Sequence, residues 1–258
     1  MNPPQISIEQ LGAALLDRIA PALQTLGNGI VSGVTATRRD LEHRMYEQAT
    51  VASARYALNH MVKAMPCRQT KYNSGGRLEL LELALTLAKV DGFFAEFGVF
   101  KGESLRFIAD RIDRIAYGFD SFEGLPSDWF LGMSKGTYSL DGELPDIGAV
   151  QRNVRLVKGW FETSIPLFTS EVREPAAFLH IDCDLYESTK IVLDCLSDRI
   201  VPGTVIVFDE YLNYPGWEQH EFKAFQEFCG ARSVKYSYVA FAPIMFSVAI
   251  RIDDLKAP

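Results

Sequence analysis

Residues 176–182 read AAFLHID and residues 204–210 read TVIVFDE. Each segment is a short apolar run that ends in acidic residues, Asp182 in the first and Asp209-Glu210 in the second. A continuous apolar run of this length is typical of a strand buried on both faces of a parallel sheet. Neighbouring parallel strands lie about 4.8 Å apart, so acids that follow two of them can converge on one point. The two segments therefore predict a parallel sheet with carboxylates gathered at one edge.

From residue 77 on, apolar strands alternate with helices in this same pattern. Two closing strands are joined by a link too short for a parallel crossover, so one of them should be antiparallel. The sequence therefore predicts an α/β fold, a Rossmann-like doubly wound sheet of about seven strands, mostly parallel, with an antiparallel strand near one edge. This architecture is similar to that of class I S-adenosylmethionine-dependent methyltransferases. We expect strands over 92–97, 115–119, 154–157, 176–181, 204–208, 234–238 and 245–251, and helices over 77–89, 103–112, 161–168, 185–200 and 216–228.

The first 75 residues carry no convincing strand and are expected to form an N-terminal helical extension. Apolar residues at three-to-four spacing predict helices over 6–26 and 40–65, separated by Gly27-Asn28-Gly29 and ended by Pro66. We expect residues 1–75 to be this extension and residues 76–258 to be the methyltransferase domain. The extension either covers a face of the core or acts as a lid or dimer contact.

Composition and charge restrict the class of protein. The chain has 258 residues, 48% of them hydrophobic, and 33 acidic against 26 basic side chains give a net charge of −7. A duplex-binding protein needs a cationic surface, so nucleic acid is not an expected partner. Neither a signal peptide nor a membrane span is recognisable, and we expect a cytoplasmic protein with no membrane partner. The absence of CxxC and of Cys/His zinc spacing predicts free thiols at Cys67, Cys183, Cys195 and Cys229.

A glycine-bearing turn follows the strand at 92–97. Glycine lets a ligand approach the backbone, and the start of the next helix offers free N–H groups. The dinucleotide pattern GxGxxG is absent because Phe100 and Lys101 stand where small residues are needed, which argues against a nicotinamide oxidoreductase. S-adenosyl-L-methionine carries a single carboxylate in place of a pyrophosphate and therefore needs fewer small residues in the turn. An ordinary strand–helix turn without a ligand is an equally simple interpretation. The candidate cofactor-binding residues here are Glu96, Gly98, Lys101, Gly102 and Ser104, of which Lys101 and Ser104 would meet the carboxylate.

The next two strand ends carry further candidate cofactor contacts. Asp120, with Ser121 beside it, follows the second expected strand, and an acid there suits a bidentate bond to ribose hydroxyls. Either residue also suits a helix N-cap. Gly159 and Trp160 follow the third expected strand and offer close backbone approach with a flat ring for adenine. A tryptophan of the core is the alternative for Trp160.

The strongest constellation is acidic. Asp182-Cys183-Asp184 ends one strand and Asp209-Glu210 ends the next. Three oxygen ligands without His or Cys suit a hard cation, Mg²⁺ first and Ca²⁺ or Mn²⁺ next. Like charges this close repel one another, which also favours a cation between them. The alternative is that these acids cap helices or pair with Arg and Lys.

Four motifs resemble those of one enzyme family. They are FDSFEGLP at 119–126, GWFET at 159–163, DCDLYEST at 182–189 and DEY at 209–211. Over about residues 75–230 the chain resembles the macrocin O-methyltransferase (TylF/MycF) family. Members of that family methylate sugar hydroxyls of macrolide antibiotics with S-adenosylmethionine and Mg²⁺.

The resemblance implies a metal site at Asp182, Asp209 and Glu210, with Asp182 near the attacking hydroxyl. The family usually has Asp where this chain has Glu210, and Trp-Arg-Gly-Gly where residues 100–103 read Phe-Lys-Gly-Glu. The resemblance also implies a homodimer. A substrate-side flap would be formed by residues 122–126 and the loop that runs to residue 146.

The predicted function is Mg²⁺-assisted O-methylation of a small-molecule acceptor, a hydroxyl of a sugar or glycosylated natural product. Mg²⁺ would lower the pKa of the hydroxyl while a carboxylate takes its proton, and Asp182 is both ligand and candidate base. His220 is a second candidate for the base, or a substrate contact, although a histidine at a helix start is commonly a solvated residue. Catechol-type methylation of a small aromatic diol and non-catalytic nucleoside binding are the alternatives.

Overall fold

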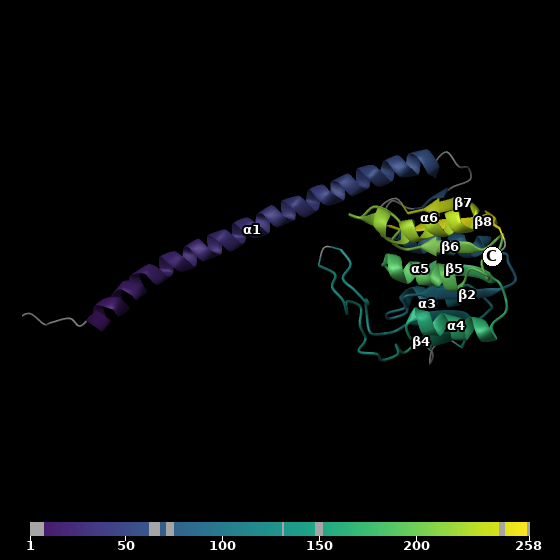
Figure 1. Cartoon of the computed structure of the whole chain (residues 1–258), viewed down its shortest axis with the longest axis horizontal. Helices are drawn as coiled ribbons and strands as arrows, with labels where there is room; N and C mark the ends of the chain where they lie inside the picture. The colour runs from purple at the N-terminus through teal and green to yellow at the C-terminus, as the bar shows by residue number, and fades with distance from the viewer. Residues whose placement is uncertain are drawn as a thin grey trace, which may run out of the picture. The chain divides into compact units, whose positions relative to one another are not determined.

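One sheet of eight strands organises the computed structural model of the chain, in the order β1-β7-β8-β6-β5-β2-β3-β4 (Figure 1). The structure describes residues 8–61, 68–70, 75–130, 132–147, 152–242 and 246–256. The strands are β1 (Arg68–Gln69), β2 (Phe93–Phe97), β3 (Ala116–Asp120), β4 (Val154–Lys158), β5 (Ala176–Ile181), β6 (Val205–Phe208), β7 (Lys235–Phe241) and β8 (Val248–Asp254). The helices are α1 (Ile8–His60), α2 (Gly76–Leu87), α3 (Glu103–Ala109), α4 (Phe161–Glu171), α5 (Tyr186–Cys195) and α6 (Glu221–Arg232), with a 3₁₀ helix η1 (Trp217–Gln219).

The strand directions confirm the predicted fold class. β8 runs antiparallel to β6 and β7, whereas the other neighbouring strands are parallel. The strands and helices predicted from residue 77 on are present, with small shifts at most of their ends. Two helices differ more: the one predicted over 185–200 ends at Cys195, and the one predicted over 216–228 begins as η1 before α6.

The strand β1 corrects the expectation that the first 75 residues hold no strand. Arg68 and Gln69 pair in parallel with Ala240 and Phe241 of β7. The backbone N–H of Thr70 extends the pairing by donating to the carbonyl oxygen of Phe241 at 3.1 Å. Two residues are too few to show an alternation of apolar and polar side chains, so only the pairing with β7 reveals this strand.

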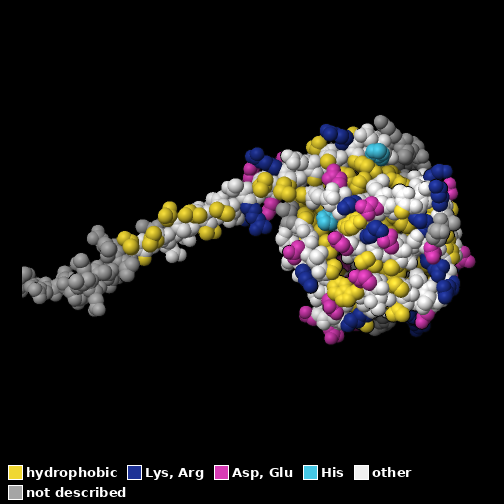
Figure 2. Space-filling model, viewed as in Figure 1, with side chains coloured by type: hydrophobic (Ala, Val, Ile, Leu, Met, Phe, Trp, Pro, Cys, Tyr) yellow, Lys and Arg dark blue, Asp and Glu magenta, His cyan; other side chains and the backbone are white. Residues whose placement is uncertain are grey.

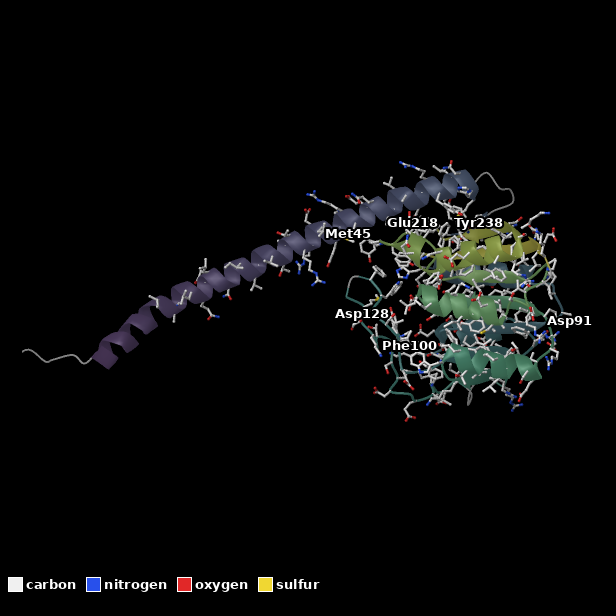
Figure 3. The ribbon with its side chains drawn as sticks, in the orientation of Figure 1. Met45, Asp91, Phe100, Asp128, Glu218 and Tyr238 are labelled. Carbon is white, nitrogen blue, oxygen red and sulfur yellow. The ribbon has the colours of Figure 1, made fainter. Side chains whose placement is uncertain are left out.

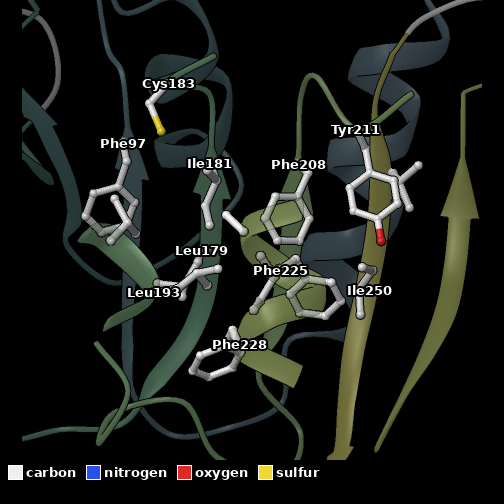
Figure 4. Packing of buried hydrophobic residues seen from close by; sticks show 14 of the residues in the cluster. Phe97, Leu179, Ile181, Cys183, Leu193, Phe208, Tyr211, Phe225, Phe228 and Ile250 are labelled. Carbon is white, nitrogen blue, oxygen red and sulfur yellow. The ribbon is translucent and has the colours of Figure 1, made fainter. Parts of the chain in front are cut away.

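Helices cover both faces of the sheet, and alternate residues of the central strands supply two separate cores. On one face Leu179 and Ile181 of β5 pack with Phe208 of β6, Leu193 of α5 and Phe225 of α6 (Figure 4). The other face holds Phe94, Phe178 and Val207 of the sheet with Leu80, Leu81, Leu105 and Ile108 of α2 and α3. Burial on both faces holds the strands in register, and their carboxyl ends therefore form a fixed edge.

Helix α1 runs without interruption over Ile8–His60, so the predicted separation into two helices at Gly27-Asn28-Gly29 is wrong. Glycine inside a helix costs about 1 kcal/mol relative to alanine, which weakens a helix without ending it. The chain divides into two units, Met1–Glu47 and Gln48–Pro258, and α1 contributes residues to both. Pro66, the predicted end of the second helix, and Cys67 lie outside the described residues. The other three predicted free thiols, at Cys183, Cys195 and Cys229, are free.

The two parts of α1 differ in burial. In the second unit the last turns of α1 pack against the core, and the Tyr56 hydroxyl lies 2.6 Å from that of Tyr238, which Figure 3 labels. Met61, directly after the helix, is buried. In the first unit hydrophobic side chains run exposed along the helix (Figure 2), among them Leu23, Leu26, Ile30, Val31 and Val34. Of the helices that the structure describes, none combines the length and hydropathy that crossing a membrane requires.

Candidate active site

The carboxyl ends of β2 and β5 approach so closely that the turn after β2 requires glycine. Gly98 has a φ of +92°, and a Cβ added there would lie 1.7 Å from the carbonyl oxygen of Asp182. The Asp182 N–H in turn donates to the carbonyl oxygen of Phe97 at 2.9 Å. Gly98 therefore allows the turn and the acid Asp182 to lie side by side.

Asp120 organises the same turn. Its Oδ2 accepts hydrogen bonds from the backbone N–H groups of Val99 and Phe100, both at 2.8 Å, and its Oδ1 accepts one from Phe122 at 2.7 Å. These bonds connect the end of β3 to the turn after β2. The ribose contact predicted for Asp120 stays a prediction, and the structure adds this backbone role.

Glu96 and Ser104 belong to a buried polar network behind the turn. Ser104 Oγ donates to Glu96 Oε1 at 3.2 Å, and His180 Nδ1 lies 2.8 Å from Glu96 Oε2. Burial opposes a charge on His180 and is the largest effect on it, but its contacts with Asp209 and Glu96 outweigh burial and raise the pKa of His180 to about 10. His180, which the sequence analysis did not single out, connects this network to the end of β6, because its Nε2 lies 3.7 Å from Asp209 Oδ1.

A cavity of about 710 Å³ opens at this edge of the sheet. From the segment predicted to be a flap, residues 124–127 and Tyr138 line it as well. Glu96 and His220 are not among the residues that line it. The cavity thus brings together most of the predicted cofactor and metal residues, namely Gly98, Lys101, Gly102, Ser104, Asp120, Ser121, Gly159, Trp160, Asp182, Asp209 and Glu210.

Aromatic side chains form part of the cavity wall. Phe100, labelled in Figure 3, meets Tyr138 edge-on with ring centroids 5.5 Å apart. The Lys101 ammonium lies 5.1 Å from the centroid of the Phe100 ring. Trp160 is 39% exposed, so its ring is available to a ligand and does not belong to the core.

Arg77, another residue that the sequence analysis did not single out, lies between the two strand-end acids. Its Nη2 donates to Asp182 Oδ2 at 2.6 Å, and its Nε donates to Asp209 Oδ1 and Oδ2 at 2.6 and 2.7 Å. Ser247 Oγ donates to Asp209 Oδ1 at 2.9 Å. One guanidinium therefore connects the carboxyl ends of β5 and β6.

This arrangement shifts the pKa values of the two acids in opposite directions. Burial, followed by the charge of Asp209, raises the pKa of Asp182 to about 7, although Arg77 opposes the rise. Burial also disfavours the Asp209 carboxylate and is the largest effect, but Arg77 and His180 together outweigh it and lower the pKa of Asp209. The arrangement therefore favours the carboxylate form of Asp209 over that of Asp182.

Asp184 and Glu210 complete the acidic cluster. Asp184 is only 7% exposed. Glu210 Oε2 is buried and has no hydrogen-bond partner among the described residues. The pKa values of Asp184 and Glu210 are both raised, mainly by burial and secondly by the negative charge of neighbouring acids. Ligand atoms within 4.8 Å of one another occur in two groups, His180 with Asp182 and Asp209, and Asp182 with Asp184 and Glu210.

His220 lies apart from this cluster, at the N-cap position of α6. Its ring centroid is 6.0 Å from that of Tyr214 and 6.3 Å from that of Trp129. Burial lowers the pKa of His220, so the neutral imidazole is favoured there. The structure does not bring this candidate base to the cavity wall.

The residues that the sequence analysis missed differ in the signal they offered. Asp184 was quoted in the acidic constellation but was not chosen as a site residue, although its position beside a strand end was a usable signal. Arg77 reaches the site from α2, 105 positions before Asp182 and 132 before Asp209, and no local pattern announces it. His180 lies inside an apolar strand, where a histidine is commonly a core residue.

Comparisons with known proteins identify relatives of this chain. The family model described as Macrocin-O-methyltransferase (TylF) matches residues 75–237. The 8-demethyl-8-(2,3-dimethoxy-alpha-L-rhamnosyl)-tetracenomycin-C 4'-O-methyltransferase of Streptomyces olivaceus is 27% identical over 165 residues, 52% of this chain and 60% of that relative. The demethyldecarbamoylnovobiocin O-methyltransferase of Streptomyces niveus is 30% identical over 147 residues, 49% of this chain and 55% of that relative. The chain therefore matches little more than half the length of these curated relatives.

Solved structures agree on the fold. The calicheamicin methyltransferase CalS11 gives a TM-score of 0.54 at 23% identity, covering 70% of this chain and 80% of that one. The O-methyltransferase NovP gives 0.52 at 22% identity, covering 69% and 80%. Since the family model matches well over half of the residues, the chain belongs to the macrocin O-methyltransferase (TylF) family of enzymes, as its motifs predicted.

Proposed function

We propose that the chain is an S-adenosylmethionine-dependent O-methyltransferase that acts on a hydroxyl of a sugar or glycosylated natural product. Its family and the names of its relatives support methyl transfer to such acceptors. One observation carries the proposal: a single cavity is lined both by the glycine turn with Asp120 and Trp160 and by the acids that end β5 and β6. A cofactor and an acceptor hydroxyl can therefore meet in one enclosed space.

A divalent cation, Mg²⁺ first, is part of the proposal. The donors at this edge are carboxylate oxygens, which hard cations prefer, and one of them, Glu210 Oε2, is buried without a hydrogen-bond partner among the described residues. Asp182, Asp209 and Glu210 are the ligands predicted from the resemblance. When bound, such an ion lowers the pKa of an acceptor hydroxyl and orients its oxygen.

Asp182 is the proposed general base. Its carboxyl lines the cavity, and a general base must lie within reach of the hydroxyl proton that it takes. S-adenosylmethionine carries the methyl group on a sulfonium, which is already activated for transfer. Much of the rate of methyl transfer then comes from the cavity holding the methyl group and the acceptor oxygen in line. His220 remains the second candidate predicted from the sequence.

The cofactor assignment is tested by calorimetry with S-adenosylmethionine and S-adenosylhomocysteine, with and without Mg²⁺. We expect both nucleosides to bind at micromolar concentration. If neither binds, the methyltransferase assignment fails. A panel of sugar and catechol acceptors then distinguishes glycoside methylation from methylation of a small aromatic diol.

Asp182→Asn tests the proposed base. We expect this variant to lose methyl transfer while its affinity for S-adenosylhomocysteine stays nearly intact. Asp194→Asn is the matched control, because Asp194 lies on α5 in an exposed pair with Lys190. Unchanged turnover in Asp182→Asn would remove Asp182 from its role, and activity that survives complete treatment with EDTA would remove the cation.

The predicted domain division belongs to the same proposal. Residues 1–75 form the extension that provides a lid or dimer contacts, and residues 76–258 form the methyltransferase domain. The exposed apolar side chains of α1 support a contact with a second copy in a homodimer. The predicted cytoplasmic location stays a prediction from the sequence.

A further inference from the structure

Two aromatic residues of the cavity wall have left-handed backbones. Phe100, in the glycine turn after β2, has a φ of +47°, and Tyr138, in the predicted flap, has a φ of +67°. This conformation is uncommon and costly for a residue with a bulky side chain. Residues strained in this way gather at active sites and ligand clamps, where the surrounding structure holds them. Two separate segments therefore accept strain at the residue that brings an aromatic ring to the cavity.

Hydrogen bonds to other segments hold both residues in place. The Phe100 N–H donates to Asp120 Oδ2 at 2.8 Å, which connects the glycine turn to the end of β3. In the flap, the Leu125 N–H donates at 2.9 Å to the carbonyl oxygen of Thr137, the residue before Tyr138. The position of each ring is therefore set by contacts of its backbone.

The two rings meet edge-on, with centroids 5.5 Å apart and planes inclined by 67°. The Tyr138 hydroxyl donates to Met133 Sδ at 3.5 Å, within the flap, so the ring and not the hydroxyl makes the contact with Phe100. Tyr138 is still 41% exposed, which leaves part of its ring available to a ligand in the cavity. The pair thus joins the flap to the glycine turn beside the place where a ligand would lie.

The other side of the flap is anchored more firmly. Trp129 and Phe130 pack against the core, and their ring centroids lie 5.6 and 5.0 Å from that of Tyr214, which is fully buried. A segment opens most easily where the fewest buried apolar contacts are lost. The flap should therefore open at the half-exposed contact between Tyr138 and Phe100, while Trp129 and Phe130 stay in place.

We propose that the contact between Phe100 and Tyr138 closes the cavity over the nucleoside, and that Tyr138 is a positioning residue for methyl transfer. The inference rests on the proposed function, because it concerns the cofactor of the same cavity. With the rings in contact, the flap retains the nucleoside and keeps water from the reacting atoms. Opening of the contact then releases S-adenosylhomocysteine, the nucleoside left after methyl transfer.

Asparagine variants test the contact, because asparagine tolerates a left-handed backbone and has no aromatic ring. We expect Tyr138→Asn and Phe100→Asn each to release S-adenosylhomocysteine about tenfold faster than the wild type, the effect of losing one aromatic contact. The double variant should release it no faster than the faster single variant, since either substitution breaks the same contact. Tyr138→Phe is the matched control, which keeps the ring and should behave like the wild type. Stopped-flow fluorescence of Trp160, which lines the same cavity, measures the rates.

The possible outcomes separate this inference from the proposed function. A wild-type rate in a folded asparagine variant would overturn the inference and leave the proposed function intact. A double variant in which the two single effects multiply would also overturn it, because the rings would then act separately. Tyr138→Phe that is as fast as Tyr138→Asn would assign the effect to the hydroxyl, against the inference. Wild-type protein that binds no S-adenosylhomocysteine would refute the proposed function and the inference together. Thermal denaturation reports whether each variant folds, and if one asparagine variant does not, the other carries the test.

Discussion

Gly98→Ala is expected to destabilise the protein by far more than a single methyl group suggests. Gly98 has a φ of +92°, and the new Cβ would lie 1.7 Å from the Asp182 carbonyl oxygen, where ordinary contact begins at 3.4 Å. That oxygen belongs to the backbone at the end of β5 and cannot rotate away as a side chain can. The turn and the strand end must therefore separate by about 1.7 Å.

Two terms determine the magnitude. A left-handed conformation costs an L residue about 1–2 kcal/mol. Forcing an extra carbon into a packed site costs typically about 1–3 kcal/mol more. Gly136→Ala is the matched control, because Gly136 has a φ of +84° and a Cβ added there has nothing within 4 Å. The control therefore measures the conformational term alone, and Gly98→Ala should be the less stable variant by about 1–3 kcal/mol.

Urea and thermal denaturation of the two variants measure this difference. At about 2–4 °C per kcal/mol for a domain of this size, the midpoint of Gly98→Ala should lie about 2–12 °C below that of Gly136→Ala. Equal midpoints would refute the reasoning, because they would mean that the strand end accommodates the methyl group freely.

Two further predictions concern α1. The Tyr238 hydroxyl lies between two others, 2.6 Å from that of Tyr56 and 2.9 Å from that of Tyr211. Tyr238→Phe should therefore lower the free energy of unfolding by about 1–3 kcal/mol. Tyr56→Phe removes a hydroxyl at the end of this row and should lower it by about 1 kcal/mol. Equal losses in urea denaturation would contradict the central place of Tyr238. Replacing Leu26 and Ile30 with serine should convert a dimer to a monomer in size-exclusion chromatography with light scattering, without changing nucleoside affinity. A wild-type protein that is monomeric at every concentration would contradict the proposed dimer contact.

Local patterns were sufficient to predict the fold class, because the strands and helices that define it are encoded by residues close together in the chain. Apolar runs such as 176–181 and 204–208 become strands that are buried on both faces, and the short link before β8 dictates its reversed direction. The continuous helix α1 shows the limit of such patterns. Glycine weakens a helix by a small amount, and the flanking helical turns outweigh that cost between residues 27 and 29. The strand β1 depends entirely on its partner and has no pattern of its own.

The sequence by itself determined which acids stand at the carboxyl edge of the sheet, since parallel strands must bring their carboxyl ends to the same side. It also determined the family, through motifs that are contiguous in the chain. Only the tertiary structure decided how those acids are paired. Arg77 reaches Asp182 and Asp209 from positions more than a hundred residues away, and His180 meets Glu96 across two neighbouring strands. Such pairings depend on how α2 packs on the sheet and on the register of β2 with β5, which no local spacing encodes. The pairing of Asp182 and Asp209 through Arg77 is therefore a property of the fold.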